Sequence, residues 1–126
     1  MKILVADDSF DWLNMHSLEM EECCGEDLEL ISACSASEAL NIYKEEAPFD
    51  LVITDLQMES DFEPLYAGEW LIKEIQFLNP NQNILIVSAC FDIDIIADTY
   101  EVEYLSKRLI TADSTSYQLK LTEIFA

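Results

Sequence analysis

The sequence predicts a doubly wound α/β domain, in which a five-stranded parallel sheet carries helices on both faces. Short apolar runs bounded by polar residues recur along the chain, as is typical of buried parallel strands; four of them lie within ILVADD, DLVITD, NILIVS and EYLSK. Stretches with helical spacing of apolar residues separate these runs. Right-handed crossovers would then place helices on both sides of the sheet.

The first strand is expected over residues 2–6 (KILVA), where a polar segment ends the apolar run. A helix follows over about 10–24. Ser9 is a suitable N-cap for this helix because a serine hydroxyl accepts a hydrogen bond from a free N–H of the first turn. Gly25 is suited to end it, since glycine readily adopts the positive φ of a helix C-terminus.

The second strand is expected over residues 28–33. A helix follows it, capped by Ser35 or Ser37, and ends near Pro48, which cannot continue a helix. Residues 50–54 (DLVIT) form the third predicted strand. This region therefore adds one complete β-α unit and the strand of the next.

A long polar stretch precedes the third helix, whose apolar residues keep helical spacing over residues 70–78. Pro80 and its neighbouring asparagines indicate a turn. Residues 84–87 then form the fourth strand, and helical spacing returns over residues 93–100. The alternation of strand and helix therefore continues through this part of the chain.

The fifth strand is short, over residues 103–105, and a last helix reaches Phe125 from a hydroxyl cap within residues 114–116. The chain of 126 residues is long enough for one domain with its own core. No composition shift divides it, so residues 1–126 are predicted to form a single domain.

The charge balance is extreme, with 26 acidic residues against 6 basic ones and a net charge of −20. Such a surface repels nucleic-acid backbones and anionic lipids, so direct binding to either is not expected. It suits a solubilising surface, or a partner that carries basic patches. No apolar stretch of membrane-spanning length and no signal-peptide pattern is present, which predicts a cytoplasmic location.

The metal ligands that cysteine and histidine provide are not clustered. The four cysteines lack the paired spacing of a zinc site, and His16 is the only histidine. His16 falls within the first predicted helix. We therefore expect it to be a packed or exposed helix residue rather than a ligand or phosphoacceptor.

Chemically active side chains follow four of the predicted strands, and they are Asp7, Asp8, Asp55, Ser88 and Lys107. Ligands of open α/β sheets bind outside the carboxyl ends of the strands, so these side chains are expected at one edge. An aspartate pair is also suited to helix capping, but capping needs only one acid. Three acids, a hydroxyl and a lysine together predict a site for a divalent cation and a phosphoryl group.

Three crowded carboxylates repel one another unless a cation is bound. Their hard oxygens favour Mg²⁺ or Mn²⁺. Asp55 beside such a cation is placed to attack phosphorus and form an aspartyl phosphate. Ser88 would donate a hydrogen bond to a phosphoryl oxygen, and Lys107 would supply a positive charge to another.

Four segments, ADDS, LVITDLQM, IVSA and YLSK, resemble the signature positions of bacterial response-regulator receiver domains, in order and at suitable spacing. The resemblance runs from about Lys2 to Phe125. It implies a flavodoxin-like fold with strand order 2-1-3-4-5. It also implies that Asp55 is the phosphoacceptor and that Asp7 and Asp8 organise the metal.

The resemblance assigns four further roles. The backbone carbonyl of Gln57 would complete the metal coordination, Ser88 and Lys107 would sense the phosphoryl group, and Tyr104 would be the switch aromatic. A histidine kinase or a histidine phosphotransfer protein would be the donor. A downstream protein or output domain would read the change on the face around residues 93–104, where self-association is compatible with the sequence but not required by it.

Two features depart from the receiver pattern. Residues 59–66 (ESDFEPLY) form an insertion beside the site, expected to be either a tolerated surface loop or a lid or docking loop. Arg108 stands where receivers commonly have a proline with a cis peptide bond. Because a cis bond to a non-proline residue costs about 2.5–4 kcal/mol, the Lys107–Arg108 bond is predicted to be trans. Arg108 would also add a cation near the acids.

Two other functions are weighed against a phosphorylated receiver, which is not an enzyme. The first is a receiver-like interaction module that works without phosphorylation. The second is an aspartyl-nucleophile phosphatase resembling the haloacid dehalogenase class, which needs an acid two residues after the nucleophile. Gln57 holds that position and cannot protonate a leaving group, which disfavours this enzyme. Whether the domain is free-standing or part of a longer regulator stays open.

Overall fold

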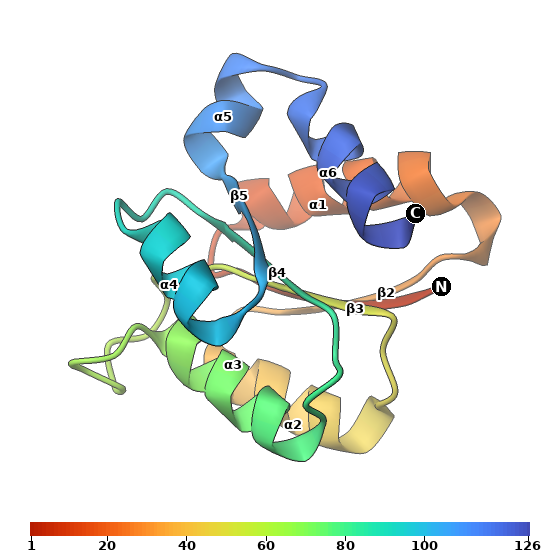
Figure 1. Ribbon diagram of the computed structural model, residues 1–126. Helices are drawn as coiled ribbons and strands as arrows, with labels where there is room; N and C mark the ends of the chain where they lie inside the picture. The colour runs from red at the N-terminus through yellow and green to blue at the C-terminus, as the bar shows by residue number, and fades with distance from the viewer.

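The computed structural model describes residues 1–126 and places five parallel strands at the centre of the molecule (Figure 1). Their order across the sheet is β2-β1-β3-β4-β5, which confirms the predicted topology. The strands are β1 (Lys2–Ala6), β2 (Glu29–Ala33), β3 (Leu51–Thr54), β4 (Ile84–Ser88) and β5 (Glu103–Ser106). The central strands β3 and β4 are buried along their whole length, as their continuous apolar sequences require.

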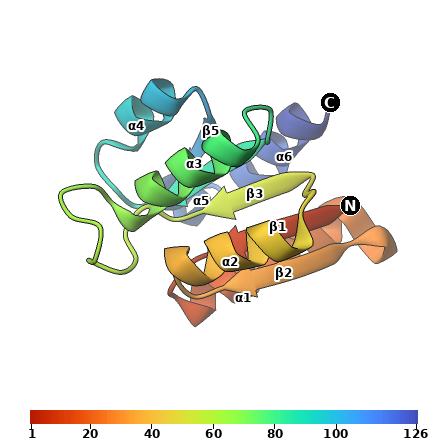
Figure 2. The ribbon, with the colours of Figure 1, turned by 90° about the horizontal axis from the view of Figure 1, so that it is seen from below.

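Helices cover both faces of this sheet, as predicted. They are α1 (Phe10–Cys24), the 3₁₀ turn η1 (Gly25–Asp27), α2 (Ala36–Glu46), α3 (Ala67–Leu78), α4 (Ile93–Tyr100), α5 (Lys107–Ala112) and α6 (Ser116–Phe125). In Figure 1, α1, α5 and α6 lie above the sheet, α2 and α3 lie below it, and α4 lies to the left, beside β4 and β5; Figure 2 shows the molecule from below, from the side of α2 and α3. None of the helices is both long and apolar enough to cross a membrane.

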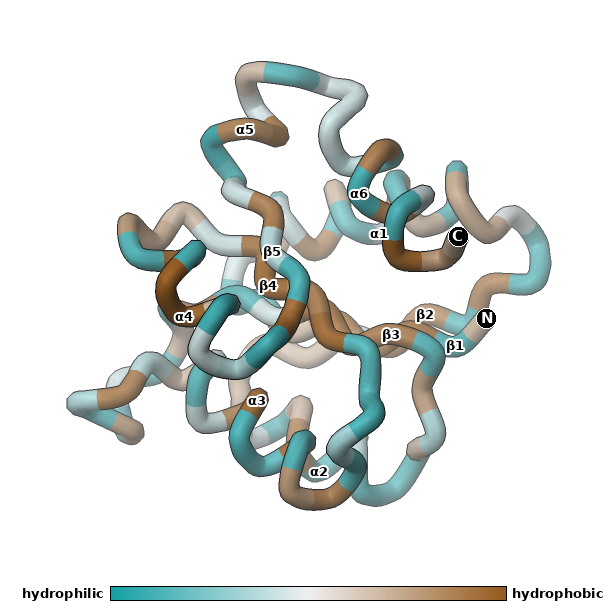
Figure 3. The backbone as a smooth tube through the Cα atoms, viewed as in Figure 1, coloured by the Kyte–Doolittle hydropathy of each residue, from teal (hydrophilic) through white to brown (hydrophobic).

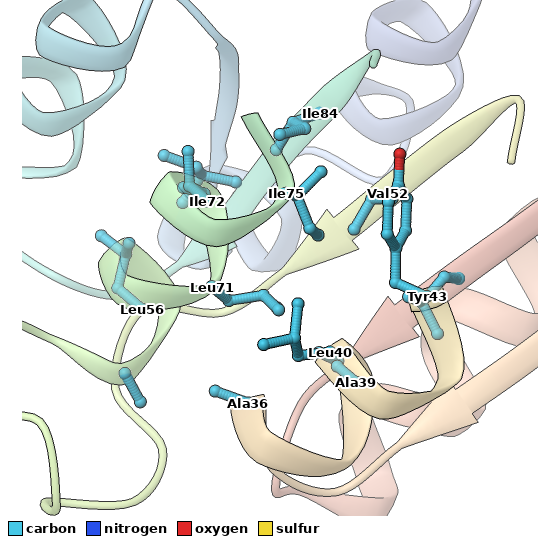
Figure 4. Packing of buried hydrophobic residues seen from close by; sticks show 14 of the residues in the cluster. Ala36, Ala39, Leu40, Tyr43, Val52, Leu56, Leu71, Ile72, Ile75 and Ile84 are labelled. Atoms are coloured by element: carbon cyan, nitrogen blue, oxygen red, sulfur yellow. The ribbon is translucent and has the colours of Figure 1, made fainter. Parts of the chain in front are cut away.

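The two faces have separate hydrophobic cores. The larger core packs α2, α3 and α4 against the sheet, and Figure 4 shows Leu40 and Leu71 meeting between α2 and α3. The smaller core contains Met20 of α1, together with Tyr117 and Leu121 of α6. Figure 3 shows the hydrophobic residues concentrated along the central strands. Burial of apolar surface on both faces therefore holds the sheet in place.

Most predicted boundaries agree with the structure to within a residue or two. Of the two proposed caps for α2, Ser35 is the one used, since its hydroxyl accepts a hydrogen bond from the N–H of Glu38. Ser9 caps α1 as predicted, and Gly25 follows that helix with a φ of +64°. Thr115, one of the predicted positions, is the N-cap residue of α6, but its hydroxyl donates to Asp113 and does not cap the helix.

Helix α5 was not predicted, because residues 107–112 are too few to show helical periodicity. The hydroxyl of Ser106 accepts a hydrogen bond from the N–H of Arg108, which caps the new helix directly after β5. Lys107 is therefore the first residue of a helix. The Lys107–Arg108 bond is trans, as predicted; the two cis bonds precede Pro48 and Pro64.

Candidate functional site

The three predicted acids meet at the carboxyl edge of the sheet. Backbone hydrogen bonds continue past the strand ends: the N–H of Asp55 donates to the carbonyl of Ala6 at 2.9 Å, and the N–H of Asp7 donates to that of Ala33 at 3.1 Å. Asp8 follows Asp7 and is exposed. One carboxylate oxygen from each acid lies within 4.8 Å of the others.

Lys107 lies among these acids. Its Nζ is 2.8 Å from Oδ2 of Asp7 and 2.9 Å from Oδ2 of Asp55. The lysine side chain is only 10% exposed, and the two carboxylates are 0% and 8% exposed. Its ammonium group also lies over the ring of Trp12, 4.8 Å from the ring centroid, which is a favourable cation–π distance. The predicted convergence of Asp7, Asp55 and Lys107 is confirmed.

The ion pairs overcome the effect of burial on the charges at this site. Burial alone would raise the pKa of Asp7, but the neighbouring His16, Lys107 and backbone N–H of Ser9 lower it overall. Burial alone would lower the pKa of Lys107, and its close contacts with the Asp7 and Asp55 carboxylates raise it instead. Asp7 and Lys107 therefore both favour their charged forms in the folded protein.

Asp8 behaves in the opposite way. Partial burial raises the pKa of this carboxyl, and the negative charges of Asp7 and Asp55 raise it further. Its ionised form is therefore disfavoured by folding, and the cost is present above the folded pKa and disappears as the pH falls through it. The site stores charge repulsion that a bound cation would relieve.

Asp8→Asn is expected to increase the free energy of unfolding of the metal-free protein at pH 7, because it removes this repulsion. The gain should shrink in acid as the wild-type carboxyl takes up its proton. Urea unfolding in a chelator at pH 7 and in acid measures both effects. Asp11→Asn, the same charge change on the exposed side of α1, should give no gain; equal gains in both variants would contradict the argument.

The donor set fits a hard divalent cation. All three candidate ligands are carboxylates, the type of oxygen ligand that Mg²⁺ takes in proteins. Oδ2 of Asp7 is fully buried and accepts no hydrogen bond of favourable geometry, although Lys107 lies close to it. A buried carboxylate oxygen without a hydrogen-bond partner is free to ligate a metal.

The side chains of the remaining predicted residues make no hydrogen bond to this group. Ser88 is fully buried at the end of β4, and its hydroxyl accepts a hydrogen bond from the N–H of Cys90. Gln57 is exposed, and its N–H makes a long hydrogen bond of 3.4 Å to Oδ1 of Asp55. Tyr104 is 41% exposed on β5 and makes no side-chain hydrogen bond.

Arg108 does not lie among the acids, contrary to the expectation of a second cation there. Its guanidinium lies over the ring of the exposed Phe91, 5.1 Å from the centroid, and makes no ion pair. The cause is α5: Lys107 turns inward as the first helical residue, and Arg108, one position further around the helix, faces solvent.

Three residues around the site were not assigned a part in it from the sequence. Gly68 in α3 passes so close to the segment after β3 that a Cβ there would lie 2.0 Å from the carbonyl oxygen of Asp55. The other two are His16 and Tyr117, which lie buried behind Asp7. The scarcity of glycine, with only two in the chain, is a signal that would have pointed to Gly68.

The insertion, residues 59–66, leaves the main body beside α3 (Figure 1, yellow-green) but is anchored at two points. The carboxylate of Glu59 accepts hydrogen bonds from the N–H groups of Ala36 and Ser37, at 2.6 and 3.3 Å, in the first turn of α2. Phe62 stacks on Trp70 of α3, with ring centroids 4.2 Å apart. Both contacts attach the loop to helices on the larger-core side.

Glu59→Ala is expected to lower the free energy of unfolding by about 1 kcal/mol, the usual cost of losing a helix cap, because two N–H groups of α2 lose their partner. Chemical denaturation measures it. Glu63→Ala removes an exposed acid from the same loop and should change stability little. Equal losses in the two variants would mean that the Glu59 contacts do not stabilise α2.

Comparison with known proteins supports the same family. No family model and no curated protein sequence matches the chain. A response regulator receiver domain protein from Clostridium thermocellum is 29% identical, with a TM-score of 0.73 over 97% of this chain and 94% of that chain. CheY in the CheX–CheY–BeF₃–Mg²⁺ complex from Borrelia burgdorferi is 20% identical, with a TM-score of 0.80 over 100% and 90%.

A third similar structure is the response regulator TrrA from Thermotoga maritima in complex with Mg²⁺ and BeF, 24% identical with a TM-score of 0.72 over 98% and 97% of the two chains. The second and third likenesses establish the fold, and the first extends the likeness to sequence. The predicted resemblance is thereby confirmed: this chain has the flavodoxin-like fold of the response-regulator receiver domains along nearly its whole length.

Proposed function

We propose that residues 1–126 form one receiver domain of a two-component or phosphorelay system and that Asp55 accepts the phosphoryl group. The observation that carries the proposal is the grouping of Asp55 with Asp7, Asp8 and Lys107 at one sheet edge. The fold supports a phosphoacceptor role in general. Two similar structures contain Mg²⁺ with a beryllium fluoride, which supports the same chemistry at this edge.

In the proposed reaction, a carboxylate oxygen of Asp55 attacks phosphorus while the bond from phosphorus to the donor nitrogen breaks. The donor is a phosphohistidine of a kinase or phosphotransfer protein. Asp7, Asp8, Asp55 and the backbone carbonyl of Gln57 would hold Mg²⁺, which supplies neutralising charge when bound. Lys107 would leave its ion pair with Asp55 and contact a phosphoryl oxygen, and Ser88 would donate to another.

Phosphorylation adds about −1.5 to −2 charge at Asp55. Ser88 ends β4, the strand beside β3, and Tyr104 lies on the next strand, β5. Reorientation of both side chains would transmit the effect of phosphorylation to the face of α4 and β5. These elements and the segments next to them carry exposed apolar side chains, namely Phe91 before α4, Ile95 on α4, Tyr104 on β5 and Leu109 on α5. We propose this face as the binding surface for the downstream protein or output domain.

The complete set of acids and the buried Lys107 favour this function over an interaction module that works without phosphorylation. A module that never binds a cation or a phosphoryl group would gain nothing from three carboxylates that repel one another. The absence of an acid at Gln57 likewise favours a receiver over a phosphatase.

The test is incubation with acetyl phosphate and Mg²⁺, with the phosphorylated species detected by intact-protein mass spectrometry. Wild type should gain one phosphoryl group, and Asp55→Asn should gain none. Asp94→Asn, an exposed position on α4, is the matched control and should behave like wild type. Unlabelled wild type, or labelling of Asp55→Asn at the wild-type level, would refute the proposal.

A further inference from the structure

Three buried polar side chains form a row that starts at Asp7 and runs away from solvent. His16 of α1 is 1% exposed, and Asp7 and Tyr117 of α6 are fully buried. Nε2 of His16 lies 3.8 Å from Oδ2 of Asp7, and its Nδ1 lies 2.5 Å from the hydroxyl of Tyr117. Burial of polar groups costs free energy unless each group has a partner, so these three side chains are expected to stabilise one another.

The directions of the hydrogen bonds in this row follow from the chemistry of its members. Burial raises the pKa of Tyr117 well above its usual value, so the hydroxyl keeps its proton and can donate it to Nδ1 of His16. A neutral imidazole that accepts at Nδ1 carries its proton on Nε2. That N–H then lies on the side of the ring that faces Oδ2 of Asp7, at a distance of 3.8 Å, which is an electrostatic contact longer than a direct hydrogen bond.

The oxygen that faces His16 is the one without a hydrogen bond of favourable geometry, Oδ2 of Asp7. The ammonium group of Lys107 lies closer to this oxygen, at 2.8 Å, and also contacts Asp55. When Lys107 turns to a phosphoryl oxygen, His16 is the remaining side chain that faces Oδ2, while the N–H of Ser9 still donates to Oδ1 of Asp7 at 2.9 Å.

We propose that His16 is a positioning residue for the metal site: its Nε2–H, fixed by the Tyr117 hydroxyl at Nδ1, orients the Asp7 carboxylate for cation binding. This inference rests on the proposed function and extends it to the helices α1 and α6, which carry His16 and Tyr117. Partners of metal-ligating groups commonly set metal affinity in this way, and their loss typically costs about 10–100-fold in affinity.

The first measurement is made on the metal-free protein. Long-range ¹H–¹⁵N NMR of the imidazole reports which nitrogen carries the proton. We expect an Nε2-bound proton in wild type whose signals shift in Asp7→Asn, and loss of the single tautomer in Tyr117→Phe. A ring protonated on Nδ1 alone, or one insensitive to Asp7→Asn, would overturn the proposal.

The second measurement is Mg²⁺ affinity by isothermal titration calorimetry, with unfolding free energies measured in parallel. His16→Leu fills the buried space with an apolar side chain but removes the N–H donor. This variant should bind Mg²⁺ about 10–100-fold more weakly. His16→Gln retains an N–H donor at a similar distance and should restore most of the affinity. Tyr117→Phe should lie between these two.

Loss of stability alone has to be separated from loss of positioning. Met20→Ala supplies that control, since Met20 is fully buried one turn further along α1 in the same core. It should lower stability without weakening Mg²⁺ binding. Equal affinities in His16→Leu and wild type, or equal losses in His16→Leu and Met20→Ala, would overturn the positioning role. Should wild type take up no Mg²⁺, the proposed function fails, and the NMR result still decides the role of His16.

Discussion

Lys107→Met is expected to lower the free energy of unfolding of the metal-free protein by about 3–5 kcal/mol at pH 7. In the wild-type protein, Lys107 contacts Asp7 and Asp55 within 3 Å. The substitution leaves these two buried carboxylates with no cation between them. Breaking a buried ion pair by removing one partner is more costly than removing both, because the remaining charge stays unpaired. Urea unfolding in a chelator measures the loss.

Two further conditions identify the cause of this loss. Saturating Mg²⁺ should recover a large part of it, because a bound cation replaces the missing charge, and acid should reduce it as both carboxyls take up protons. Lys73→Met, the same change at an exposed lysine without an ion pair, should alter stability little. A loss in Lys107→Met that neither Mg²⁺ nor acid reduces would show that side-chain packing, and not charge, is responsible.

Gly68→Ala is expected to lower the free energy of unfolding by about 3 kcal/mol, at the upper end of the range for overpacked positions. The added Cβ would lie 2.0 Å from the carbonyl oxygen of Asp55 and 2.7 Å from the Cα of Leu56. Both are backbone atoms, so no side-chain rotation relieves the clash. The start of α3 must move away from the end of β3, which displaces the Asp55 carboxylate.

The comparison for this prediction is Gly25→Ala. Gly25 has a positive φ, so alanine there should cost about 1–3 kcal/mol through backbone strain, but the new Cβ meets nothing within 4 Å. Both variants should be less stable, and only Gly68→Ala should also react more slowly with acetyl phosphate under conditions in which it remains folded. Wild-type labelling of folded Gly68→Ala would show that the close approach does not position Asp55.

The sequence predicted the sheet and the acid site because both depend on short local patterns. The run LVIT predicts a buried strand, and Asp55 is the residue that directly follows its carboxyl end. Parallel strands bring such ends to one edge of the sheet. The position of Lys107 follows from the same rule. The strand order itself came from the resemblance to receivers.

What was missed depends on contacts between distant segments. His16 and Tyr117 are 101 residues apart, and nothing in either local sequence indicates that they meet behind Asp7. Helix α5 has too few residues for a periodic pattern, which is why Arg108 was expected beside the acids. The insertion was correctly located, but its attachment to α2 depends on the single carboxylate of Glu59.

The placement of the two tryptophans gives this domain two separate optical reporters. Trp12 lies under the ammonium group of Lys107, so its emission should change when that cation moves. Trp70 stacks on Phe62 and should follow the insertion instead. Since these are the only two indoles in the chain, the Trp70→Phe and Trp12→Phe variants would each leave one local signal. Stopped-flow fluorescence on the pair would then show whether the loop moves before, with or after the lysine.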